Sequence, residues 1–251
     1  MKIVLIGSGN VATVLGRLMV SKQHQIIQVI SRDILNAQTL AQEFVAGFSD
    51  FSGKPDLSAD IFIIAVADQA LDHLFTQQHM GNKLVLHTAG SASIDVLQKM
   101  SENYGVLYPL QSLRKEMKLI PPIPFLIDGN TEDVTKFIED FAHSISDAVR
   151  RVGDEERLKL HAAAVVVSNF TNHLYAIAEE FCEKENIDFA MLKPLILETA
   201  YRVQSVLPSK VQTGPAVRKD IITMDKHLRI LAAHPKLRSM YLRLTDSIMN
   251  P

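Results

Sequence analysis

The stretch Lys2-Ile3-Val4-Leu5-Ile6-Gly7-Ser8-Gly9-Asn10-Val11-Ala12 decides the fold of this 251-residue chain. Residues 2–6 form an apolar run of strand length, rich in β-branched side chains, which is typical of a strand buried on both faces. A turn with the pattern G-x-G-x-x-A follows, and apolar residues then recur at helical spacing at Val14, Leu15, Leu18 and Met19. The stretch therefore predicts a strand, a glycine turn and a helix.

The residue types in this turn suit the phosphates of a dinucleotide. Gly7 permits a tight turn, Gly9 lacks the Cβ that would hold a pyrophosphate away from the backbone, and Ala12 lets the helix lie close to the sheet. The phosphates are expected at the positive N-terminus of the helix. A glycine turn that binds nothing is the alternative. We assign cofactor binding in the turn to Gly7, Ser8, Gly9, Asn10 and Val11.

The end of the next strand indicates which dinucleotide binds. Residues 26–30 read as a second strand, and Ser31-Arg32 stands where an acidic residue would hold the ribose 2′-hydroxyl of NAD. Ser31 can hydrogen-bond a 2′-phosphate, and Arg32 offers a planar set of donors. We expect Asp33 to turn away. The pair predicts NADP, with NAD as the alternative cofactor and a merely polar strand exit as the alternative interpretation.

Composition indicates a soluble enzyme of two domains, with 47% hydrophobic residues and a net charge of −2. This charge, with no long basic run, argues against a nucleic-acid partner. The single cysteine, Cys182, excludes an internal disulfide and suits the cytoplasm. We expect no membrane span, no signal peptide before the first strand and no metal site, because no apolar segment reaches membrane-spanning length, Gly7 ends the first apolar run early, and no Cys/His cluster stands at metal spacing.

Apolar strands alternate with helices up to about Gly153, which predicts an α/β domain with a doubly wound, mainly parallel sheet, the Rossmann arrangement, over residues 1–153. The further strands are expected at 60–66, 83–87, 105–108, 124–127 and 148–152. Helices are expected at 34–44 and from a Thr131 cap to about Ser146. Ligands of such sheets bind at the carboxyl ends of the strands. Cofactor contacts are therefore also assigned to Ala65, Val66, Ala67, His87, Thr88, Ala89 and Gly90.

Residues 154–251 read as an all-helical domain for substrate binding and dimerisation. Helices are expected at 155–186, 189–206, 216–233 and 235–249, with turns at 186–188, 207–209 and 234–235. This domain is too apolar to stand alone at about 100 residues, which favours a homodimer.

The first of these helices is apolar all round at 162–167, which predicts a buried helix. His161, Ser168 and Asn172 lie within roughly 20° of one line on it, with Asn169 to one side. Two interpretations are open for this polar stripe. It is a set of satisfied core residues, or it faces the nicotinamide with His161 as proton donor and Asn169 and Asn172 orienting the substrate.

Three other residues have a functional and a structural interpretation. His87 is a catalytic acid or a structural histidine at a strand exit. Gln111 contacts substrate or belongs only to a turn. Arg218 holds a substrate carboxylate from a helix that Thr213 caps, or it lies at the surface beside Asp220.

Several segments resemble the bacterial proteins that join a Rossmann-like domain to a domain of unknown function 2520, also described as F420-dependent NADP oxidoreductase-like. The segments are 86–91, 106–111, 161–174 and 213–220. The glycine turn is similar to that of pyrroline-5-carboxylate reductases, and the layout resembles the 6-phosphogluconate dehydrogenase-like group. The resemblance implies an NADP-binding oxidoreductase that dimerises through its helical domain, and it names no substrate.

The sequence departs from better-known relatives at two places. Thr213-Gly214-Pro215-Ala216 stands where pyrroline-5-carboxylate reductases have Gly-Gly-Thr-Thr, and His161 stands for the catalytic lysine of hydroxyacid dehydrogenases, with Lys159 as the alternative. The function we predict is hydride transfer between NADP and a small molecule with a C=O, C=N or flavin-like acceptor. An NADP-binding sensor without turnover is the alternative, because fold alone does not separate the two.

Overall fold

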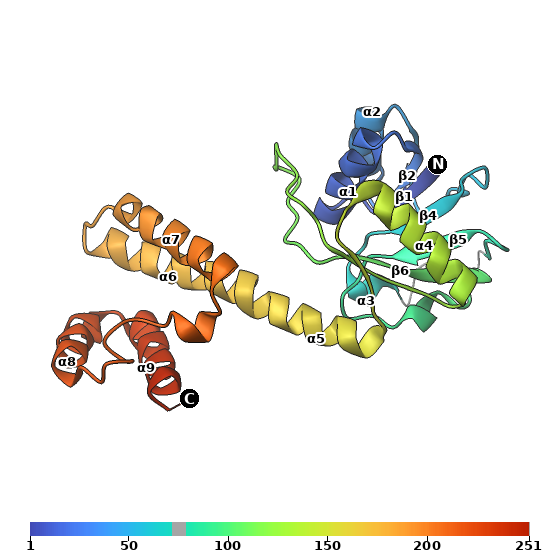
Figure 1. The fold of residues 1–251 in the computed structure, drawn as a ribbon. Coiled ribbons are helices and arrows are strands. Elements are labelled where there is room, and N and C mark those ends of the chain that lie inside the picture. Colours follow the sequence, from blue (N-terminus) through green and yellow to red (C-terminus); the bar gives the residue numbers. More distant parts are fainter. Residues whose placement is uncertain (72–78, 251) are drawn as a thin grey trace. The chain divides into compact units, whose positions relative to one another are not determined.

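The computed structural model describes residues 1–71 and 79–250 (Figure 1). The chain divides into two compact units, Met1–Val166 and a second that begins at Val167. The helix α5 (Asp154–Ala164), which the sequence assigned to the helical domain, belongs to the first unit. The two compact units thus divide 13 residues after the predicted boundary at residue 153, and the functional division at residue 153 stays a prediction.

In the described residues, the first unit has one eight-stranded sheet with the order β3-β2-β1-β4-β5-β6-β7-β8. All neighbouring strands pair in parallel except β6 and β7, which are antiparallel. This confirms the doubly wound, mainly parallel sheet. The strands are β1 (Lys2–Ile6), β2 (Gln25–Ile30), β3 (Gly47–Ser49), β4 (Ile61–Ile64), β5 (Leu84–His87), β6 (Asn103–Pro109), β7 (Phe125–Gly129) and β8 (Val149–Arg151).

Helices and hydrophobic side chains cover both faces of this sheet. The helices α1 (Asn10–Ser21), α2 (Ile34–Phe44) and α4 (Glu132–Ile145) pack on one face in a cluster that includes Ile3 and Leu5 (Figure 1). Val4 and Ile6 pack on the other face with side chains of α3 (Asp68–Leu71) and the 3₁₀-helix η1 (Ile94–Leu97). The alternation along β1 explains why its sequence is a continuous apolar run.

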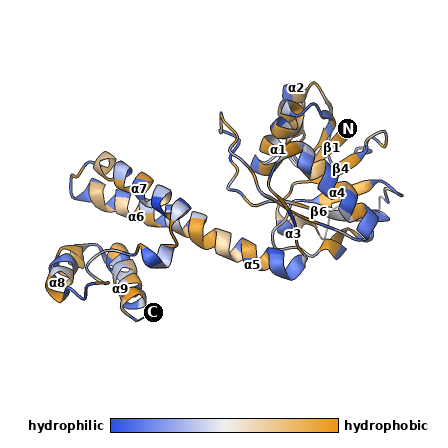
Figure 2. Ribbon diagram, in the orientation of Figure 1, coloured by the Kyte–Doolittle hydropathy of each residue, from blue (hydrophilic) through white to orange (hydrophobic). Residues whose placement is uncertain are grey.

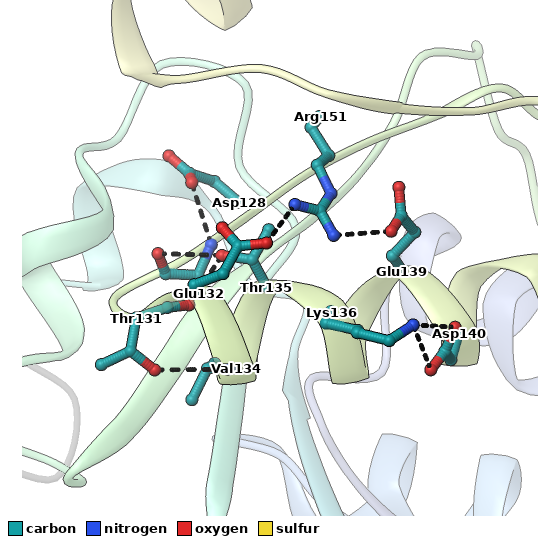
Figure 3. A network of polar contacts seen from close by, with 10 residues as sticks. Asp128, Thr131, Glu132, Val134, Thr135, Lys136, Glu139, Asp140 and Arg151 are labelled. Atoms are coloured by element: carbon teal, nitrogen blue, oxygen red, sulfur yellow. Dashed lines mark hydrogen bonds and ion pairs between the residues drawn. The ribbon is translucent and has the colours of Figure 1, made fainter.

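Helix α4 is fixed at its start and along its side (Figure 3). The hydroxyl of Thr131 accepts a hydrogen bond from the amide of Val134 at 3.2 Å, which confirms the predicted cap. Arg151 of β8 donates to Glu132 at 2.6 Å and to Glu139 at 2.7 Å. These ion pairs lie on the outer side of the helix and connect it to the edge strand.

The second unit is helical in its described residues, as predicted. After the π-helical turn η2 (Val165–Phe170) come α6 (Thr171–Lys184), η3 (Phe189–Leu192), α7 (Lys193–Ser205), η4 (Pro208–Lys210), α8 (Ile221–Ile230), η5 (Leu231–Ala233) and α9 (Pro235–Met249).

Three predictions for the helical part were wrong, and two of them concern its first helix. The helix expected at 155–186 is interrupted by the π-helical turn, whose i→i+5 bonding winds fewer degrees per residue than an α-helix, so the straight stripe does not continue through it. The side chains of Val166 and Val167 are also exposed within the chain rather than buried.

The helix expected at 216–233 begins at Ile221 instead, because Asp220 caps it by accepting from the amide of Thr223 at 3.0 Å. Arg218 therefore lies in the turn before the helix. The sequence reading also missed β3, a three-residue strand at the sheet edge.

Candidate functional site

The glycine turn between β1 and α1 has the geometry that its sequence predicts. Gly7 has a φ of +119°, and a Cβ there would lie 2.2 Å from the carbonyl oxygen of Ala65, so only glycine fits. A Cβ on Gly9 would meet nothing within 4 Å, so the chain's own packing does not require glycine there. No side chain caps the N-terminus of α1. The open space at Gly9 and the uncapped helix end fit a pyrophosphate.

Two polar side chains of α1 make hydrogen bonds to the backbone of Lys115. The side chain of Asn10 accepts a hydrogen bond from the amide of Lys115 at 3.1 Å, and Arg17 donates to the Lys115 carbonyl at 2.5 Å. The segment that follows β6 is thus attached to α1 beside the turn. Val11 is half-buried.

At the end of β2, the hydroxyls of Ser8 and Ser31 are 2.7 Å apart, and Ser31 is buried. Arg32 is exposed and makes no hydrogen bond or ion pair within residues 1–71 and 79–250. Asp33 caps α2 by accepting from the amide of Leu35 at 2.9 Å, so its carboxylate is engaged there. The exposed group at this position is a guanidinium, which fits the 2′-phosphate of NADP.

The ends of β4 and β5 lie beside the turn in the sheet. Ala65 is buried, Val66 is half-buried and Ala67 is exposed. Thr88 donates both its amide and its hydroxyl to the carbonyl of Ile64, at 3.1 and 3.2 Å. Ala89 and Gly90 are buried.

His87 is 0% exposed, which argues against direct contact with a cofactor. Its Nδ1 accepts from the amide of Ala89 at 3.1 Å, and its Nε2 has no partner among the residues described. Burial, reinforced by the charge of Arg157, lowers the pKa of His87 to about 4. The geometry favours the structural interpretation of this histidine.

The first turn of α5 is joined to the segment after β5 by a buried arginine. Arg157 is 1% exposed and donates to Asp154 at 2.7 Å and to the carbonyl of Ala92. Asp154 also accepts from the amide of Ile94 at 3.2 Å. The sequence reading missed both residues, although their i,i+3 spacing at a predicted helix start was a usable signal.

His161 lies one turn further along α5, against Tyr108 and Gly90. Its Nδ1 is 2.8 Å from the hydroxyl oxygen of Tyr108, and a Cβ on Gly90 would lie 2.6 Å from the same nitrogen. Tyr108 is buried, and burial together with the charge of Asp68 raises the pKa of its phenol. The sequence reading missed Tyr108, although it closes the predicted strand 105–108 at the edge where ligands bind.

The remaining predicted residues are not joined to this cluster. Asn169 and Asn172 are exposed and belong to the second unit, as does the exposed Arg218. Gln111 is exposed in the first unit, where its side chain accepts from the amide of Ser112 at 2.9 Å. Their substrate roles stay predictions.

Two classes of site are absent from the described part of the chain. Residues 1–71 and 79–250 contain no group of three or more metal-ligating side chains that could hold a metal ion. No helix in the same ranges is long and apolar enough to cross a membrane.

Comparison with known proteins is consistent with this geometry. Residues 2–90 match the family model described as NADP oxidoreductase, coenzyme F420-dependent, and residues 123–248 match the model of domain of unknown function 2520. A solved structure from Bacteroides fragilis, assigned as an NADP oxidoreductase, is 36% identical, with a TM-score of 0.89 over 100% of this chain and 98% of that one.

A solved structure of lower identity shows the fold alone. A 1-pyrroline-5-carboxylate reductase from Streptococcus pyogenes is 15% identical, with a TM-score of 0.65 over 100% of this chain and 99% of that one. A glutamyl-tRNA reductase from Methanococcus maripaludis is 24% identical over 148 residues, 55% of this chain and 38% of that protein's length. The chain thus spans well under half of this curated relative.

The second family model covers half of the chain, and the Bacteroides fragilis relative is matched over nearly its whole length. The chain therefore belongs to the family of NADP oxidoreductases that join a Rossmann domain to the domain of unknown function 2520.

Proposed function

We propose that the chain transfers hydride between NADP and a small molecule with a C=O, C=N or flavin-like acceptor, and that His161 exchanges the accompanying proton. One observation carries this proposal. His161 lies against Gly90 and Tyr108, at the carboxyl ends of β5 and β6, which is the edge of the sheet where ligands of this fold bind.

The cofactor residues have separate tasks. The turn at Gly7 and Gly9 receives the pyrophosphate at the uncapped N-terminus of α1, and the guanidinium of Arg32 binds the 2′-phosphate. The segment Thr88–Gly90 lies beside the nicotinamide. When bound, the nicotinamide supplies the hydride, and the protein supplies orientation and the proton.

His161 supplies the acid–base group. A carbonyl or imine that accepts a hydride at carbon needs one proton at its oxygen or nitrogen, and a positioned donor typically accelerates such a step a hundred-fold or more. Histidine is suited to this because its ordinary pKa lies near neutrality. The substrate roles predicted for Asn169, Asn172, Gln111 and Arg218 remain proposals that substitution of each residue can test.

We also propose a homodimer built largely by the helical unit. Val167 is 72% exposed and Met191 is 76% exposed. Figure 2 shows hydrophobic stretches on α7, α8 and α9. The described part of this unit buries few of its own large side chains, since α7 and α9 bury none. A second copy of the chain supplies the apolar surface that such helices need.

The cytoplasm is the compartment in which we propose that the enzyme works. Cys182 is the single cysteine of the chain, and it is buried and unpaired.

The test has two steps. The full chain is titrated with NADPH and with NADH by cofactor fluorescence, and NADPH oxidation is then followed with 1-pyrroline, an aldehyde, a ketone and flavin mononucleotide as probes. Tighter binding of NADPH and oxidation that His161→Gln reduces a hundred-fold or more support the proposal. Binding without oxidation by any probe favours the sensor instead, and no binding of NADPH overturns both.

A further inference from the structure

The contact between Tyr108 and His161 joins two elements that the sequence separates by 53 residues. The rings meet edge to face, with centroids 5.8 Å apart and an angle of 74° between their planes. Nδ1 of the imidazole is directed at the phenol oxygen, so Nε2 is the ring nitrogen available to a substrate. Gly90 gives the imidazole room, because a Cβ there would lie 2.6 Å from Nδ1 and 3.0 Å from Cζ of Tyr108.

A hydroxyl suits this position because its oxygen can accept a hydrogen bond from a ring N–H. Nδ1–H is present both in the protonated ring and in the neutral ring that has lost its Nε2 proton. The imidazole can therefore gain or lose a proton at Nε2 while Nδ1–H keeps donating to Tyr108. The raised pKa of Tyr108 keeps the phenol uncharged at neutral pH, so its oxygen accepts a hydrogen bond from Nδ1–H without taking the proton.

The backbone on both sides of this contact is held in place. Arg157, four residues before His161 and on the same side of α5, donates to the Ala92 carbonyl, and Asp154 accepts from the amide of Ile94. The segment after β5 is therefore tied to the helix that carries His161. Tyr108 approaches from β6, which pairs directly with β5.

We infer that Tyr108 is the positioning residue of this site: its hydroxyl holds Nδ1 of His161, so that Nε2 is the atom that passes the proton to the substrate. The inference rests on the proposed function. In the reducing direction the hydride forms the new C–H bond, and the Nε2–H bond of the protonated imidazole breaks as the substrate oxygen or nitrogen takes the proton. The ring is left neutral, with Nδ1–H still donating a hydrogen bond to the hydroxyl of Tyr108, and water reprotonates Nε2.

The contact is tested without any substrate by ¹⁵N NMR of the histidine rings in the full chain. The chain has nine histidines, and His161→Gln identifies the His161 signals. We expect the dominant neutral tautomer of wild-type His161 to carry its proton on Nδ1, and we expect Tyr108→Phe to show averaging of the two ring nitrogens. Tyr104→Phe is the matched control, because Tyr104 is buried on the same strand and its hydroxyl bonds to nothing in the described ranges.

Gly90→Ala is a second variant that leaves Tyr108 intact, and the added methyl group should displace the imidazole and give the same averaging. Unchanged His161 signals in both folded variants overturn the inference. If Tyr108→Phe does not fold, the Gly90→Ala spectrum decides alone.

The kinetic test uses whichever probe the enzyme reduces. Tyr108→Phe should lower kcat roughly ten-fold, the size of one neutral hydrogen bond, with KM within about two-fold and with a shifted pH profile. If His161→Gln abolishes turnover while Tyr108→Phe matches wild type, only this inference fails. If His161→Gln has no effect, the proposed function of His161 fails.

Discussion

A Cβ on Gly7 would lie 2.2 Å from the carbonyl oxygen of Ala65, whereas a Cβ on Gly9 would meet nothing within 4 Å. The first glycine is thus required by the fold, and the second is explained by a ligand. Gly7→Ala should lower the free energy of unfolding by about 2 kcal/mol or more, because alanine is strained at positive φ and the contact must open. Urea unfolding of the ligand-free chain measures this.

Gly9→Ala is the matched control. It should leave the ligand-free stability within about 0.5 kcal/mol of wild type and weaken NADPH binding, since its methyl group occupies the space of the pyrophosphate. Equal stability losses in the two variants, or unchanged NADPH affinity in Gly9→Ala, would contradict this division of roles.

Arg32 is the exposed cation at the end of β2, and it has no protein partner in the described ranges. Arg32→Ala should weaken NADPH binding by roughly 1.5–3 kcal/mol, the value of a hydrogen bond to a charged group, and leave NADH binding nearly unchanged. Fluorescence titration measures both affinities. Arg150→Ala is the control, because Arg150 is an exposed arginine at the opposite edge of the sheet. Parallel losses for NADPH and NADH would rule out a 2′-phosphate contact.

His87 gives the fold a specific sensitivity to acid. Burial, with the charge of Arg157, lowers its pKa from 6.5 to about 4. The unfolded chain therefore takes up this proton near pH 6.5 while the folded chain resists it until about pH 4. The free energy of unfolding is therefore not reduced by this group above pH 6.5, and it falls progressively as the pH drops from 6.5 toward 4. The loss between pH 7 and pH 5 should be roughly 2 kcal/mol.

Urea unfolding at the two pH values tests this in wild type and in His87→Asn, in which that part of the pH dependence should disappear. His143→Asn is the control, because His143 is exposed. If His87→Asn keeps the full pH dependence of wild type, burial of His87 is not its cause.

The exposed apolar face of the helical unit predicts a dimer. Light scattering of the full chain at micromolar concentration should give twice the mass of one chain, and Val167→Asp should shift the equilibrium toward monomer. Leu119→Asp is the control, because Leu119 is 87% exposed in the first unit. A wild-type protein that scatters light with the mass of one chain would contradict the dimer. Equal shifts toward monomer in Val167→Asp and Leu119→Asp would contradict an interface on the helical unit.

The sequence predicted the sheet well because its signals are local. The strand at Lys2–Ile6, the helix at Ile34–Phe44 and the Thr131 cap were predicted with the bounds or the contact that the structure has. The three-residue strand β3 has too few residues for a period to show. The start of α8 was misplaced because Gly214-Pro215 resembles a helix start, while the cap is Asp220.

The candidate site was only partly predictable. Gly7, Gly9 and Arg32 lie on one strand–turn–helix–strand unit, where position in the chain defines position in space. Tyr108 and His161 meet only after β6 and α5 have packed, so no spacing in the sequence reports their contact. The lowered pKa of His87 also depends in part on the charge of Arg157, which is distant in the sequence. The π-helical turn at Val165–Phe170 has no signal that we recognise in its residues.

The most direct test of the account is a crystal structure of the full chain with NADP⁺ bound. The account predicts the pyrophosphate at Gly9, the 2′-phosphate at Arg32, and the nicotinamide beside Gly90, with Nε2 of His161 one substrate width from C4 across an open space. A structure in which His161 is packed in a dimer interface and points away from the nicotinamide would contradict it.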